Sequence, residues 1–188
     1  MRPAPTPSQT VGPFFGVALL NNIGPELVRP DAPGATRIRG RVLDGAGEPV
    51  PDAMLEIWQA NSAGRYAHPA DTRHDLPVDE GFTGFGRCGT DPEGWFEFVT
   101  LKPGPVPGPE GRLQAPHIDV SVFARGLLKR LVTRIYFPDE EEANAVDPVL
   151  SSIPDLDDRA GLVASVHDGT LRFDIRLQGD RQTAFFAV

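Results

Sequence analysis

Hydrophobic and polar residues alternate along several short segments of the chain, as expected for β-strands with one buried and one solvated face. The segments with this pattern are residues 36–43, 53–60, 95–100, 117–123, 131–137, 171–178 and 183–188. Twenty Pro and twenty Gly residues are scattered between and around them and favour sharp turns. The pattern predicts an all-β protein, an antiparallel β-sandwich of about eight strands with long Pro/Gly-rich loops and one or two short helices.

Turn and helix signals refine this prediction. Residues 87–90 and 95–100 flank the turn sequence Asp91-Pro-Glu-Gly and are expected to pair as a β-hairpin. Asp139 is the expected N-cap of a short helix, because an acidic first turn follows it and suits the helix dipole. A second short helical turn is expected near residues 155–160.

The first fifteen residues differ from the rest of the chain. They contain four prolines, which fix φ and remove amide donors, so residues 1–15 are expected to form an extended N-terminal arm. Phe14 and Phe15 end this arm, and leaving each in water costs about 1.5–3 kcal/mol relative to burial. We therefore expect the arm to dock on a surface of this chain or of a partner, with one sandwich domain at residues 16–188.

Composition excludes several classes of protein. The net charge of −8 argues against a nucleic-acid-binding protein, which needs a basic face to replace the counterions of phosphates. No apolar run is long enough for a transmembrane helix, and residues 1–7 lack the apolar core of a signal peptide. With Cys88 as the single cysteine, no internal disulfide is possible, and a cytoplasmic location is expected.

Two polar side chains on one predicted strand are candidates for metal binding. His117 and Asp119 are two residues apart, so both project from the same face and are able to share one metal ion. An ordinary strand with a solvated polar face has the same spacing. Arg134 lies on a neighbouring predicted strand whose two faces both look half-buried, so its charge needs a partner such as Glu56 or Asp119.

A long irregular loop supplies the remaining polar candidates. Residues 60–86 contain Tyr66, His68 and His74, and a loop of this length inside a compact domain is often functional. The two histidines have no helical or strand spacing to each other, which favours plain surface residues. The sequence has no Gly-rich phosphate loop, no Gly-x-Ser-x-Gly and no Cys-x-x-Cys, so nucleotide and acyl-transfer chemistry are poorly supported.

Six short stretches occur together in a characteristic order. They are Thr6-Pro-Ser-Gln-Thr-Val-Gly-Pro-Phe14, Glu56-Ile-Trp-Gln-Ala-Asn, Gly64-Arg-Tyr66, Gly86-Arg-Cys-Gly-Thr-Asp, Lys102-Pro-Gly-Pro105 and Pro116-His-Ile. In this order they resemble the intradiol ring-cleavage dioxygenases, and the resemblance runs from residue 6 to the C-terminus. It implies a β-sandwich in which a catalytic chain binds one non-haem Fe(III) through two tyrosines and two histidines.

The resemblance places the four iron ligands on specific residues. The first tyrosine falls on Tyr66 and the first histidine on His117, and both are retained. The second tyrosine falls on Val106, which has no ligating atom, and the second histidine falls on Asp119. An arginine that the catalytic chain carries just before its histidines is Gln114 here. Ferric iron accepts a carboxylate oxygen, so the loss of the second tyrosinate is the more serious departure.

This pattern of loss, together with residues 115–126 and 133–137, resembles the α subunit of a two-subunit family member. That resemblance implies a hetero-oligomer of several α/β pairs in which the β subunit holds the Fe(III) and this chain holds none. The expected reaction of the complex is the cleavage of protocatechuate by O₂ to 3-carboxy-cis,cis-muconate.

The resemblance also implies that the α subunit lends residues to a substrate pocket at the α/β interface. These residues are Thr10, Gly12 and Pro13 of the arm, and Arg134, whose guanidinium suits an aromatic carboxylate. Simpler roles stay open at this point. Gly12 and Pro13 would also suit a turn, Thr10 a cap, and Arg134 an internal ion pair.

Two other functions remain as alternatives. One is a self-sufficient metal-dependent intradiol dioxygenase that uses Tyr66, His117 and Asp119 with a substitute ligand. The other is a β-sandwich binding module with no reaction. Val106 argues against the first because it removes a ligand, and the family-like arm sequence at residues 10–15 argues against the second.

Overall fold

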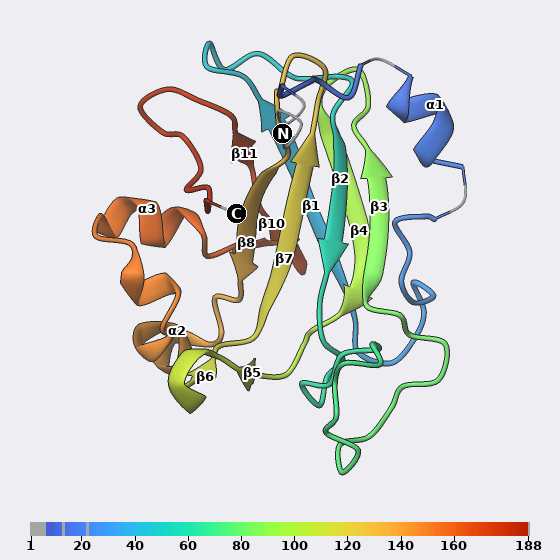
Figure 1. The fold of residues 1–188 in the computed structure, drawn as a ribbon, viewed down its shortest axis with the longest axis vertical. Helices are drawn as coiled ribbons and strands as arrows, with labels where there is room; N and C mark the ends of the chain where they lie inside the picture. The colour runs from blue at the N-terminus through green and yellow to red at the C-terminus, as the bar shows by residue number, and fades with distance from the viewer. Residues whose placement is uncertain (1–6, 13, 22, 188) are drawn as a thin grey trace, which may run out of the picture.

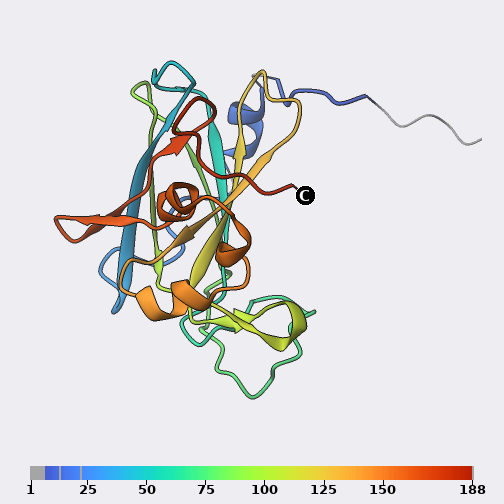
Figure 2. The ribbon, with the colours of Figure 1, turned by 90° about the vertical axis from the view of Figure 1, so that its left-hand side faces the viewer.

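The computed structural model describes residues 7–12, 14–21 and 23–187. Two β-sheets lie face to face, with loops and short helices around their edges (Figures 1 and 2). The first sheet comprises β1 (Ala35–Leu43), β4 (Trp95–Leu101), β9 (Ser165–His167), β10 (Thr170–Arg172) and β11 (Ile175–Arg176). The second has the order β3 (Phe85–Gly89), β2 (Met54–Trp58), β7 (His117–Phe123) and β8 (Leu131–Tyr136). A small ladder joins β5 (Val106–Pro107) to β6 (Leu113–Gln114).

The hydrophobic core fills the space between the two sheets. Alternate residues of each central strand are buried there, as the period of two in the sequence predicts. The fully buried members of this core include Ile38, Val42, Leu55, Ile57, Phe96, Phe98, Ile118, Val120, Val122 and Ile135. The predicted β-sandwich is therefore confirmed, and the residues between these positions project outward to form the two outer faces.

The pairing of the strands differs from the prediction in two respects. The hairpin of residues 87–100 is wrong, because β3 pairs with β2 whereas β4 pairs with β1 in the other sheet. The turn itself is present, and Asp91 Oδ1 accepts the backbone N–H of Trp95 at 2.8 Å. A tight turn fixes only its own geometry, and the burial of each strand's apolar face decides which sheet it joins. In addition, β10 and β11 pair with β1 in parallel, so the sandwich is not purely antiparallel.

The described residues form three short α-helices, α1 (Phe15–Leu19), α2 (Glu141–Val146) and α3 (Leu156–Gly161), one more than predicted. Two 3₁₀ turns cover Pro109–Gly111 and Leu150–Ser152. None of these helices has the length and apolar character needed to cross a membrane.

The two predicted helix starts fare differently. Asp155 caps α3, and its Oδ1 accepts the backbone N–H of Asp157 at 2.8 Å, so this helix is confirmed. The assignment of Asp139 as an N-cap is wrong. The second helix begins only at Glu141, and Asp139 instead accepts Lys102 Nζ at 2.7 Å. The ammonium of Lys102, distant in sequence, competes for the carboxylate, which a local capping pattern does not reveal.

The described part of the N-terminal arm contacts its own chain at the turn between β7 and β8. Gly126 donates its backbone N–H to Thr10 Oγ1 at 2.9 Å. Phe15 begins α1 and is buried at 7% exposure, whereas Phe14 is 79% exposed. One of the two aromatic residues therefore gains the burial that we expected for both. The division of the chain at residue 15 stays a prediction.

Candidate functional site

A cavity of about 650 Å³ opens on the outward face of the second sheet. The alternation of β2, β7 and β8 projects acidic, basic and apolar side chains into it. The lining residues are Glu56, Ile57, Trp58, Phe85, Asp119, Ser121, Arg130, Val132, Arg134, Val149 and Phe186. The C-terminal segment, predicted to be a closing strand, reaches this face through a single bridge between Phe186 and Val132.

Arg134 carries the positive charge at the centre of this site. It lies opposite Asp119 in the register of β7 and β8, and its Nε donates to Asp119 Oδ1 at 2.8 Å. Its Nη1 donates to Gln114 Oε1 at 2.6 Å. Of the two partners that the sequence left open, the structure selects Asp119, because Glu56 forms an ion pair with Arg87. Burial opposes the charge of Arg134, but Asp119 and Tyr136 outweigh this effect and raise its pKa, so the guanidinium stays charged.

Two buried residues that sequence analysis missed support this arrangement. Tyr136 lies within 3.4 Å of Arg134 Nη1 and donates its hydroxyl to Asp147 Oδ1 at 3.1 Å. Burial raises the pKa of Tyr136 well above its ordinary value, so its hydroxyl remains a neutral donor. Asp147 is completely buried and also accepts the backbone N–H groups of Ala115 and Leu150 at 2.8 and 2.7 Å. A single Asp before a Pro gives no signal of such a role in the sequence.

His117 is buried and held in one orientation. Its Nδ1 lies 2.7 Å from the carbonyl oxygen of Ala115, which makes Nδ1 the protonated nitrogen of the neutral ring. Its Nε2 lies 4.0 Å from Asp119 Oδ1. Burial lowers the pKa of His117, and the charge of Arg134 lowers it further, so the imidazole is neutral at pH 7.

The two other positions matched to iron ligands lie beside this cluster. Tyr66 stacks on Trp58 with ring centroids 5.7 Å apart. Burial raises the pKa of Tyr66, and the negative charge of Asp119 raises it further, so the phenol is protonated. Val106 is buried and pairs with Gln114 in the small β5–β6 ladder. The structure thus gathers Tyr66, Val106, His117 and Asp119 around the side chains that surround Arg134.

These residues do not fit a ferric ion. Val106 offers no donor atom, and Asp119 already binds a guanidinium through Oδ1. The fixed positive charge of Arg134, bonded to the same carboxylate, would repel a trivalent cation. Among residues 7–12, 14–21 and 23–187, no group of three or more His, Cys, Asp and Glu side chains is arranged to hold a metal ion.

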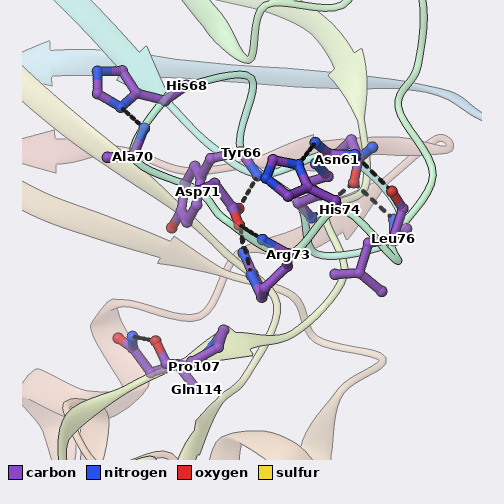
Figure 3. Close-up of polar contacts among 12 residues, drawn as sticks. Asn61, Tyr66, His68, Ala70, Asp71, Arg73, His74, Leu76, Pro107 and Gln114 are labelled. Carbon is purple, nitrogen blue, oxygen red and sulfur yellow. Dashed lines mark hydrogen bonds and ion pairs between the residues drawn. The ribbon is translucent and has the colours of Figure 1, made fainter.

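The loop histidines make their hydrogen bonds within the loop itself (Figure 3). His68 Nδ1 accepts the backbone N–H of Ala70 at 3.1 Å, and His74 Nδ1 lies 3.3 Å from Arg65 Nη2. Both are exposed, which agrees with their interpretation as surface residues. Asp71 organises the loop nearby, because its carboxylate binds Arg73 and the backbone N–H of Tyr66. The hydrogen bond from Arg73 holds the pKa of Asp71 far below its usual range.

The residues predicted to bind substrate lie in two separate places. Thr10 contacts Gly126, which follows the C-terminal end of β7, whereas Arg134 bonds to Asp119 near the N-terminal end of the same strand. Gly12 has a φ of +72°, a conformation that favours glycine. Pro13 lies outside the described residues. Within one chain, Thr10 and Arg134 therefore do not form a common pocket.

Comparisons with known proteins agree with the fold. A family model described as Dioxygenase matches residues 12–179. The chain is 44% identical to the protocatechuate 3,4-dioxygenase alpha chain of Burkholderia cepacia, over 97% of both chains. It is 46% identical to the beta chain of the same species over 120 residues, covering 63% of this chain and 50% of that one.

A solved structure extends the comparison to three dimensions. The dioxygenase domain of a dioxygenase carbohydrate-binding fusion from Streptomyces sp. SirexAA-E superposes with a TM-score of 0.57 at 26% identity. The match covers 94% of this chain and 99% of that domain. The sandwich, the gathered ligand positions and these matches lead to one conclusion. The chain belongs to the intradiol dioxygenase family.

Proposed function

We propose that this chain is the α subunit of a protocatechuate 3,4-dioxygenase and completes the substrate pocket of an iron-bearing β subunit. The intradiol dioxygenases are iron-dependent enzymes. The observation that carries the proposal is the guanidinium of Arg134, which lies among the positions that match the iron ligands and is bonded to one of them. A chain with this arrangement is suited to working beside an iron site and unsuited to holding the iron itself.

The complex would open the ring of protocatechuate between its two hydroxyl-bearing carbons and form 3-carboxy-cis,cis-muconate with O₂. Iron bound by the β subunit would supply the activation of the aromatic diol toward O₂. The contribution of this chain is to bind and orient the substrate. The arm residues Thr10, Gly12 and Pro13 would reach the pocket of the partner, since within its own chain Thr10 contacts Gly126 and lies away from Arg134.

Arg134 has the geometry to bind the carboxylate of the substrate. Its Nε and Nη1 atoms bind Asp119 and Gln114, and its Nη2 makes no hydrogen bond with any residue that the structure describes. The side chain is 17% exposed and lines the 650 Å³ cavity. A guanidinium held in place by two bonds loses little conformational freedom when the remaining nitrogen binds a carboxylate.

The outward face around this cavity is also the surface that we propose for the β subunit. Trp58, Phe85, Val132 and Phe186 place apolar atoms beside charged groups there, a mixture found in protein interfaces. Docking on this face would close the cavity and shield the substrate from water. We propose that the complex contains several α/β pairs. We also propose that it is cytoplasmic, because a chain with one cysteine forms no internal disulfide and so does not need an oxidising compartment.

The first test is the metal content of the full chain, purified alone from iron-replete cells and measured by elemental analysis. We expect almost no iron in the isolated chain. After co-expression with the β subunit, we expect stoichiometric iron in the purified complex. Stoichiometric iron in the isolated chain, with the visible colour of tyrosinate on Fe(III), would contradict the proposal. It would instead favour a self-sufficient enzyme that uses Tyr66, His117 and Asp119.

The second test addresses Arg134 in the reconstituted complex. We expect Arg134→Ala to lower kcat/KM for protocatechuate by about tenfold or more, the equivalent of at least about 1.4 kcal/mol, with unchanged iron content. Arg181→Ala is the matched control, because Arg181 is exposed and is not among the residues that line the cavity. Kinetics of Arg134→Ala equal to those of the control would remove Arg134 from the substrate pocket.

A further inference from the structure

The outward face of the first sheet carries a patch in which three arginines surround one tryptophan. The guanidinium carbons of Arg39, Arg41 and Arg172 lie 4.2, 4.6 and 4.1 Å from the centre of the Trp95 ring. The register explains this cluster, because Arg41 lies opposite Trp95 and Arg39 lies beside Arg172 on adjacent strands. These four residues are called the arginine–tryptophan patch below.

The patch carries more positive charge than its neighbours neutralise. Arg172 pairs with Asp174 at 2.7 Å. Arg39 and Arg41 form no ion pair with any residue that the structure describes. The Nε of Arg41 is buried and has no hydrogen-bond acceptor within the described part of the chain. Two guanidinium groups without an ion-pair partner leave net positive charge on this face, so the patch is suited to attract an anionic group.

The chain itself presents a segment with the complementary chemistry. Asp155, Asp157 and Asp158 begin α3 and are all exposed, and Leu156 between them is 71% exposed. Asp157 and Asp158 form no ion pair within residues 7–12, 14–21 and 23–187. The segment Asp155–Asp158 therefore offers two free carboxylates beside an exposed apolar side chain. The patch offers two free guanidinium groups beside an aromatic ring.

We propose that the Asp155–Asp158 segment of one copy of this chain docks on the arginine–tryptophan patch of a second copy. Asp157 and Asp158 would pair with Arg39 and Arg41 while Leu156 packs on the ring of Trp95. The helix α3 lies along one edge of the sandwich (Figure 1), and the patch faces outward from β1 and β4. In the proposed contact, the segment of one chain would meet the patch of another.

This contact joins two different surfaces, so each copy keeps a free patch and a free segment for further contacts. Such a heterologous contact builds closed rings or open chains of copies. The contact uses neither the cavity nor the outward face that holds Arg134. It goes beyond the proposed function, and its test does not depend on a β subunit.

The test is the molar mass of the full chain in solution, measured by light scattering over a range of concentrations at about 20 and 500 mM NaCl. We expect self-association at low salt that weakens at least tenfold at high salt, because the paired charges are screened. Arg39→Glu/Arg41→Glu and Asp157→Arg/Asp158→Arg should each weaken it at least tenfold. An equimolar mixture of the two variants should restore association, because each altered surface then meets a complementary partner.

The matched controls change the same charge elsewhere on exposed surface. They are Arg29→Glu/Arg181→Glu and Asp75→Arg/Glu80→Arg, and both should associate like the original chain. Recovery in the mixture would also show that both variants fold. Three results would each overturn the proposal: a monomer under all conditions, association unaffected by the patch variants, or a mixture without recovery. Stabilisation by inorganic phosphate without a change in molar mass would show a small-anion site instead and would overturn it as well.

Discussion

The two outward faces of the sandwich both present arginine, but they treat its charge in opposite ways. On the second sheet, Arg134 is held by Asp119 and Gln114. On the first sheet, Arg39 and Arg41 stack on Trp95 without a carboxylate from the described residues. A neutralised and fixed guanidinium is suited to orient a small ligand, whereas uncompensated ones are suited to attract a charged surface. The same residue type therefore serves different purposes according to its neighbours.

The largest expected effect is on the free energy of unfolding, at the buried residue Asp147 that supports Tyr136 and Arg134. Asp147→Ala removes the acceptor for Tyr136 and for two buried backbone N–H groups, so it should lower the free energy of unfolding by about 3–4 kcal/mol. Urea-induced unfolding measures this change. Asp157→Ala, at an exposed position, should change the value by less than about 0.5 kcal/mol. Equal effects of the two substitutions would show that Asp147 is not a structural centre.

The next-largest expected effect measures how much the ion pair between Asp119 and Arg134 contributes to the free energy of unfolding. Asp119→Ala leaves Arg134 partly buried without its carboxylate, and we expect a loss of about 2 kcal/mol, less than for a fully buried pair because both side chains are partly exposed. Arg134→Met in the same chain should recover part of that loss, since no unpaired charge remains. A double-mutant cycle in urea measures the coupling. Strictly additive effects would mean that the pair contributes nothing as a pair.

A smaller effect depends on pH and on His117. The folded chain keeps His117 neutral because burial and Arg134 lower its pKa, whereas the unfolded chain protonates it near the ordinary value of about 6.5. The unfolded state thus binds more protons as the pH falls, and stability is lost below about pH 6.5. We expect a loss of about 1 kcal/mol between pH 7.5 and 5.5, and His117→Gln should reduce it. An equal slope in that variant would assign the pH dependence to another group.

The smallest effect belongs to the arginine–tryptophan patch. Arg39→Ala removes one exposed guanidinium from the ring of Trp95, which contributes about 0.5–1 kcal/mol at an exposed site. It also removes repulsion from the neighbouring arginines, so we expect a net change below about 0.5 kcal/mol in urea unfolding of the dilute monomer at high salt. A loss as large as that for Asp119→Ala would erase the distinction between the two faces.

The extent of sequence-based prediction follows from the range of the interactions involved. The alternation at residues 117–123 correctly predicts the inward and outward residues of β7, because each side chain's direction follows from its position in the strand. The turn at Asp91 and the short helix near residues 155–160 are predicted for the same local reason. The hairpin and the Asp139 cap are wrong because distant groups decide them: the facing sheet in one case, and Lys102 in the other.

The same distinction between local and distant interactions applies to the candidate site. The resemblance identifies Tyr66, Val106, His117 and Asp119 as related positions through short motifs, each of which lies within a few residues of the position it marks. The sequence leaves the partner of Arg134 open between Glu56 and Asp119, because both lie on outward faces of predicted strands. The pairing of Glu56 with Arg87 and the register of β7 with β8 make the choice.

The sequence by itself determined the periodic burial and the turns, since these depend on residue type and spacing, and its resemblance to the intradiol dioxygenases implied the altered ligand set. The tertiary structure decided which sheet each strand joins, that Asp147 and Tyr136 support Arg134, and that a guanidinium lies among the ligand positions. It also decided that three arginines meet on Trp95. Each of these depends on side chains from strands far apart in the chain, which approach one another only when the two sheets pack and exclude water.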